Sequence, residues 1–90
     1  MRTIMHIIRV IGLHMVSLDK FPLGCKGVVD SLELSDEAFR RVAAFGLIPG
    51  SRFSLSRRAP FGGPLVLEVG CTRFLLRRSL ARFIQVKVAE

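Results

Sequence analysis

The chain has 90 residues, half of them apolar, and its 14 Lys and Arg against seven Asp and Glu give a formal net charge of +7. This length holds one small domain with one core, and the apolar content excludes a disordered chain. The aromatic residues are seven Phe, without Trp or Tyr, which disfavours binding surfaces built on those two side chains.

Residues 1–14 form an apolar stretch that is interrupted by His6, Arg9 and His14. The stretch is shorter than the roughly 20 apolar residues of a membrane span and lacks the cleavage site of a secretory signal. We expect an N-terminal extension of unassigned structure over 1–14 and a folded domain over 15–90. The apolar residues 3–13 offer a surface for pairing between chains, so a homo-oligomer remains open.

The two cysteines, Cys25 and Cys71, are too few for the disulfide framework of a small secreted domain. We expect free thiols in a reducing cytoplasm, each acting as a small buried apolar side chain.

The sequence of the first half of the domain predicts a turn, a strand and a helix. The turn covers 21–24, and the β-branched residues that follow it predict a strand over 25–34. Ser35 or Asp36 then caps a helix whose first turn carries acidic residues and whose apolar residues recur at helical spacing.

The helix is expected to end at Gly46, which can take the left-handed conformation of a helix end. Pro49 prevents its continuation, and Gly50 completes a tight turn into the next strand. We expect Leu47 and Ile48 to pack onto the core.

Period-two alternation dominates residues 51–88 and predicts four strands, over 51–58, 65–70, 71–78 and 83–88, with a short helical turn at 79–83. The loop 59–64 between the first two carries the turn residues Pro60, Gly62 and Gly63. The residues expected to point inward are Phe53, Leu55, Leu65, Leu67, Val69, Phe74, Leu76, Ile84, Val86 and Val88. The predicted fold is mainly β, a small antiparallel barrel with one inserted short α-helix.

No group of residues in the sequence is arranged for catalysis, so we expect no enzyme activity. Neither histidine belongs to a recognisable pattern with a nucleophile, and the glycines of 61–63 do not open a helix as a phosphate loop does. The cysteines lack the C-x-x-C spacing of a metal site. We expect no cofactor, and weak divalent metal binding through His6, His14 and the cysteines remains open.

Basic residues are concentrated between Arg52 and Arg82, a segment with seven Arg and one acidic residue, Glu68. Such a segment favours an acidic partner, a nucleic acid or an anionic membrane surface. A solvated outer face of a barrel explains the same alternation of Arg and apolar residues.

Two turn motifs and a Leu-Arg segment, in this order, closely resemble the FeoA family, small cytosolic proteins of bacterial ferrous iron uptake. The matching residues are Gly46, Leu47, Pro49 and Gly50, then Ala59, Pro60, Gly62 and Pro64, then Leu76, Arg77 and Arg78. The resemblance covers about residues 16–88 and implies an SH3-like barrel with an inserted helix.

The resemblance also implies an accessory or regulatory protein that acts with FeoB, a membrane ferrous iron transporter with a cytosolic GTP-binding domain. We expect a protein-interaction module on the cytosolic side of that transporter, peripheral to the membrane at most and without a small-molecule substrate. The basic side chains Arg40, Arg41, Arg57 and Arg58 are the expected partner-binding residues.

Two alternatives remain from the sequence. The charge of +7 suits a small basic barrel that binds nucleic acid. The same barrel occurs as the C-terminal domain of DtxR-type metal-dependent repressors, which implies a metal-sensing domain. This chain has no room for the helix-turn-helix and dimerisation domains of such repressors, which favours a free-standing FeoA.

Overall fold

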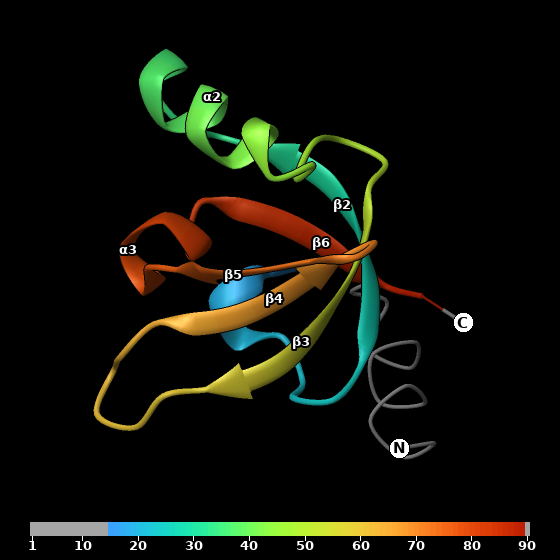
Figure 1. Cartoon of the computed structure of the whole chain (residues 1–90), viewed down its shortest axis with the longest axis vertical. Coiled ribbons are helices and arrows are strands. Elements are labelled where there is room, and N and C mark those ends of the chain that lie inside the picture. The colour runs from blue at the N-terminus through green and yellow to red at the C-terminus, as the bar shows by residue number, and fades with distance from the viewer. Residues whose placement is uncertain (1–14, 90) are drawn as a thin grey trace.

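The structure is a computed structural model that describes residues 15–89, so the expected extension over 1–14 lies outside the described residues (Figure 1). The elements in chain order are β1 Met15–Ser17, the 3-10 helix η1 Leu18–Lys20, β2 Lys26–Leu32, α2 Asp36–Ala44, β3 Arg52–Arg58, β4 Leu65–Val69, β5 Thr72–Leu76, α3 Arg78–Ala81 and β6 Ile84–Val88. None of the helices within 15–89 is long and apolar enough to cross a membrane.

All six strands form one antiparallel sheet in the order β1-β6-β2-β3-β4-β5. The register shifts between Val29 and Ser31 and between Leu55 and Arg57, and such bulges bend a strand and increase its twist. The mainly β fold with a short helix between β2 and β3 is confirmed. The hydrogen bonding of the described strands does not close, because β1 and β5 remain as edges.

The sequence pattern predicts neither β1 nor η1. A strand of three residues is too short to show a period, and Met15–Ser17 pairs with residues 85–87 at the other end of the domain. Local sequence carries no signal of such a distant partner.

The core lies inside the curled sheet. The strand residues expected to point inward are buried in eight of ten positions: Phe53, Leu55, Leu65, Leu67, Phe74, Leu76, Ile84 and Val86. Val69 and Val88 are half-buried and pack against this core. Short helices add to it, since η1 and α3 contact each other and bury Leu18 and Ala81.

The helix α2 begins and ends at residues with the expected capping geometry. The Ser35 hydroxyl, and not Asp36, accepts a hydrogen bond from the Ala38 N–H at 3.2 Å. At the other end Gly46 has φ +91°, and the N–H groups of Gly46 and Leu47 bond to the carbonyls of Ala43 and Val42. This pair of bonds is a Schellman motif, so the predicted helix end is confirmed.

Two expected burials are wrong. Ile48 is 44% exposed, because its N–H donates to the Gly46 carbonyl and to Ser51 Oγ and its backbone is thereby held in an outer turn. Cys25 is buried as expected, whereas Cys71 is exposed, because it lies at the tip of the turn between β4 and β5. Both thiols are free.

Candidate docking surface

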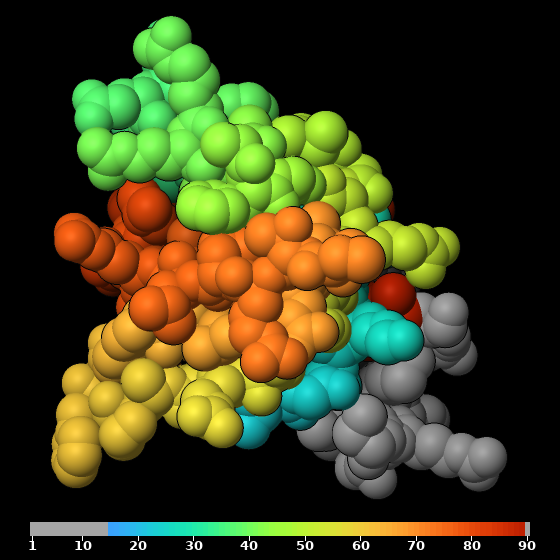
Figure 2. All heavy atoms as spheres, viewed as in Figure 1, coloured from blue at the N-terminus to red at the C-terminus, as the bar shows by residue number. Residues whose placement is uncertain are grey.

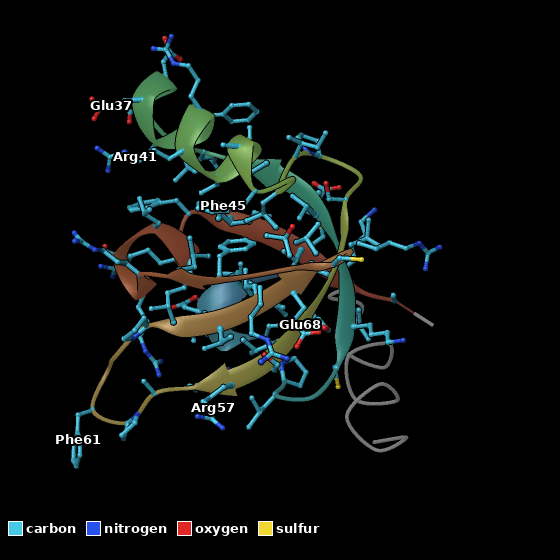
Figure 3. All side chains as sticks on the ribbon, in the orientation of Figure 1. Glu37, Arg41, Phe45, Arg57, Phe61 and Glu68 are labelled. Atoms are coloured by element: carbon cyan, nitrogen blue, oxygen red, sulfur yellow. The ribbon has the colours of Figure 1, made fainter. Side chains whose placement is uncertain are left out.

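A groove of about 440 Å³ runs between α2 on one side and β5 with α3 on the other. Val42 is the only buried residue of α2, and it lines the groove together with Ala38. Phe45, which follows the last turn of the helix, points towards β5 (Figure 3). Its ring stacks on Phe74 with centroids 4.6 Å apart and planes 10° from parallel.

Two large apolar side chains remain exposed here, Leu75 at 67% and Phe45 at 45%. Figure 2 shows this side of the molecule, with α2 (green) above β5 (orange). Leu75 lines the groove and also a second hollow on the outer face of the sheet, which it shares with Ser56, Arg57, Val66, Arg73 and Phe74. The groove and the hollow therefore meet at Leu75.

Arginines surround this apolar centre. Arg41 and Arg77 line the groove, and Arg57 lines the hollow. Arg41 is paired with Glu37 at 2.8 Å, whereas Arg57 and Arg77 make no ion pair within residues 15–89. We define the Leu75 surface as Phe45, Leu75, Arg41, Arg57 and Arg77. Its apolar centre and cationic rim match a partner that offers an apolar side chain and carboxylates.

The structure separates the four arginines that the sequence groups together. Arg41 and Arg57 belong to the Leu75 surface. Arg40 is exposed on α2 beside Asp36 and Phe39, outside the groove. Arg58 is half-buried and donates from Nη2 to the Phe21 carbonyl, so it ties β3 to the turn before β2.

The loop 59–64 is held by its own backbone and by α3. The Ala59 N–H bonds to the Pro64 carbonyl at 3.1 Å. Arg78 donates from Nε to the Gly63 carbonyl at 2.8 Å and from Nη2 to the Ala59 carbonyl at 3.1 Å. Phe61 projects from the tip, fully exposed and with φ +57° (Figure 3). The motif residues at this corner thus build a fixed loop.

Three members of the Leu75 surface are not among the partner-binding residues expected from the sequence: Phe45, Leu75 and Arg77. Alternation places Leu75 and Arg77 on the outer face but assigns them no role. The available signal is that Leu75 is a large apolar residue at an outward position of an alternating strand. Phe45 gives no such signal, because its exposure depends on how α2 sits over β5.

Within residues 15–89, no group of three or more His, Cys, Asp or Glu is placed to hold a metal ion. His6 and His14, the histidines considered as ligands, lie outside the described residues.

A curled antiparallel sheet of short strands with a helix inserted between β2 and β3 defines an SH3-like domain. A family model described as the FeoA domain matches residues 16–88. The chain therefore belongs to the FeoA family, and the resemblance seen in its turn motifs is confirmed.

Solved structures agree with this assignment. An iron uptake regulatory protein, FeoA, is 28% identical with a TM-score of 0.76, over 83% of this chain and 99% of that one. FeoA of Stenotrophomonas maltophilia, crystallised with zinc and described as a prokaryotic SH3 domain protein, is 33% identical with a TM-score of 0.64, over 82% and 89%.

The fold also occurs in a manganese-dependent transcriptional repressor, at 21% identity and a TM-score of 0.75, over 83% of this chain and 42% of the repressor. This likeness concerns the fold alone. No curated protein shows significant sequence similarity to the chain.

Proposed function

We propose that this FeoA-family protein is an accessory, regulatory protein of bacterial ferrous iron uptake. It docks on the cytosolic side of a FeoB-type transporter through the Leu75 surface and carries out no reaction of its own. The S. maltophilia relative supports this proposal, because it is proposed as a ferrous iron transport activating factor.

The observation that carries the site assignment is the exposed Leu75 beside Arg57 and Arg77, two arginines without an ion pair among the described residues 15–89. When a partner covers an exposed Leu side chain on a strand, the free energy of the complex is lowered. Arg57 and Arg77 lack acidic partners within residues 15–89, so carboxylates of a partner can pair with them without breaking an existing ion pair. We leave Arg58 out of the proposed docking surface because its guanidinium donates to the Phe21 carbonyl within the fold.

The test is calorimetric titration of the protein into the isolated cytosolic domain of its transporter, with and without guanine nucleotide. Saturable heat supports docking, and a dependence on nucleotide supports regulation of the GTP cycle. Absence of heat in every nucleotide state overturns the proposal.

A matched pair of variants tests the site. Arg57→Glu combined with Arg77→Glu places two carboxylates on the Leu75 surface and is expected to weaken docking by about tenfold or more, because like charges then face each other. Arg40→Glu changes charge on α2 outside the groove and should leave the affinity within about twofold. Equal affinities of the two variants would show that the partner binds elsewhere.

A further inference from the structure

The strand β5 is an unusual edge. The opposite edge of the sheet, β1, has three residues, whereas β5 has five and pairs with β4 without a register shift. Natural proteins protect exposed edges by shortening them, by bulges, by Pro or by charged side chains. The strand β5 carries no bulge and no Pro, and its one charged residue, Arg73, is paired with Glu68, so its backbone remains a regular template for another strand.

The backbone of Leu75 faces away from β4. In the β4–β5 register Leu75 lies opposite Val66, and the Val66 carbonyl points towards β3, where it accepts a hydrogen bond from the Ser56 hydroxyl at 3.2 Å. Paired residues in an antiparallel ladder either bond to each other or point their N–H and C=O groups outward. Val66 therefore directs its groups to β3, and Leu75 directs its groups to the free edge. Arg73, two residues earlier, has the same orientation.

The space beside this edge is the groove itself. Four consecutive residues, 74–77, line it. Since neighbouring residues of a strand point to opposite faces, a groove lined by all of them runs along the edge and not over one face. Across it lies α2 with Arg41 and Phe45 (Figure 3).

We propose that an extended segment of the partner binds in this groove as a seventh strand, paired with the free edge of β5 in the manner of strand addition. The segment is acidic, with apolar residues at alternate positions, because the groove offers apolar side chains beside Arg77, which has no acidic partner within residues 15–89, whereas Arg41 is paired with Glu37. This inference rests on the proposed docking function and specifies its mode.

Charge argues against a second copy of this chain as the occupant. Antiparallel pairing of two β5 strands about Leu75 places Arg73 of one copy opposite Arg77 of the other, twice. Like charges directly opposite each other destabilise a strand pair. An acidic segment instead brings a carboxylate to Arg77, which has no acidic partner within residues 15–89, whereas Arg73 is already paired with Glu68.

The probe is a synthetic peptide of seven residues, acetyl-Glu-Val-Glu-Val-Glu-Val-Glu-amide, added to the full chain labelled with nitrogen-15. Saturable NMR shifts centred on 73–77 and α2, with slowed hydrogen exchange of the Arg73 and Leu75 amides, are expected. A peptide in which Lys replaces Glu should bind at least about tenfold more weakly. Failure of the acidic peptide to bind, or binding without slowed exchange at these two amides, overturns strand addition.

The backbone contribution has its own controls. N-methylation of the peptide's glutamate amides, which face β5 when the carboxylates lie opposite Arg73 and Arg77, keeps the side chains but removes donors, and should weaken binding by about tenfold. On the protein, Leu75→Pro removes an N–H that faces the edge, a position where strands tolerate Pro, and Leu75→Ala controls for the lost side chain. Stronger loss with Pro than with Ala supports the proposal, and equal loss contradicts it. If Leu75→Pro does not fold, the comparison of the methylated with the unmethylated peptide tests the backbone contribution by itself.

These experiments contain no transporter, so they are independent of the titration above. A chain that binds the acidic peptide but not the transporter domain has a functional edge and a different partner. A chain that binds the domain without slowed exchange at Arg73 and Leu75 docks by another mode.

Discussion

At the scale of single residues, neighbouring arginines have different structural roles. Arg77 is exposed and unpaired within residues 15–89, whereas Arg78 is half-buried and reaches two carbonyls of the loop 59–64. Guanidinium groups that donate to carbonyls in partly buried sites contribute more to the free energy of unfolding than exposed charges do.

Replacing Arg78 with Ala should therefore lower the free energy of unfolding by about 1–3 kcal/mol, because two charge-assisted hydrogen bonds are lost. The measurement is urea unfolding followed by circular dichroism. Arg77→Ala is the matched control, and we expect a change within about 0.5 kcal/mol. Similar losses for both variants would mean that the bonds to the loop contribute no net stability.

The two cysteines give a second prediction at this scale. In the native protein one thiol should react rapidly with a maleimide, because Cys71 is exposed and Cys25 is buried. In denaturant both should react, and Cys71→Ser should abolish the rapid reaction. Rapid labelling of two thiols under native conditions would contradict the burial of Cys25.

The sequence predicts on which side of the sheet these residues lie, but not which contacts they make. Alternation correctly places Arg73, Leu75 and Arg77 outside and the strand core inside. It cannot separate Arg77 from Arg78, or Arg57 from Arg58, because the difference lies in carbonyls from distant segments: the loop 59–64 for Arg78 and Phe21 for Arg58.

At the scale of elements, α2 is well capped and lightly packed. Local sequence predicts it, since Ser35 and Gly46 provide the caps and the acidic residues Asp36 and Glu37 favour its start. The groove beneath it could not be predicted, because a groove depends on the distance between α2 and β5. Strand β1 could not be predicted from the sequence either, because it forms mainly through its pairing with β6.

Light packing predicts local mobility of α2. Because only Val42 is fully buried on the helix, its amides should exchange with solvent faster than those in the central strands β2 and β6. Native-state hydrogen exchange followed by NMR measures this difference directly. Equal protection of α2 and β2 would show that the helix opens only when the whole domain unfolds.

At the scale of the whole molecule, the charge of +7 raises the question whether the protein binds nucleic acid. Four of the described arginines are engaged within the fold: Arg41 and Arg73 are paired with acids, and Arg58 and Arg78 bond to backbone carbonyls. These four guanidinium groups are therefore less available to phosphates than exposed, unpaired ones.

We accordingly expect no measurable binding of a labelled DNA oligonucleotide at about 150 mM salt, since non-specific binding depends on many free cations and is weakened by salt. Fluorescence anisotropy tests this, with the transporter domain as the comparison under the same conditions. DNA binding as tight as domain binding would favour the nucleic-acid function over docking.

The position of β6 in the sheet has a consequence for biosynthesis. This strand, Ile84–Val88, lies between β1 and β2 and pairs with both. A ribosome releases β1 and β2 before it releases β6, so β1 has no strand partner and β2 lacks one of its two partners until β6 is made. Such contacts between distant residues form slowly, and waiting strand edges are prone to aggregation. The nascent chain should therefore depend on chaperones most strongly just before β6 emerges from the exit tunnel.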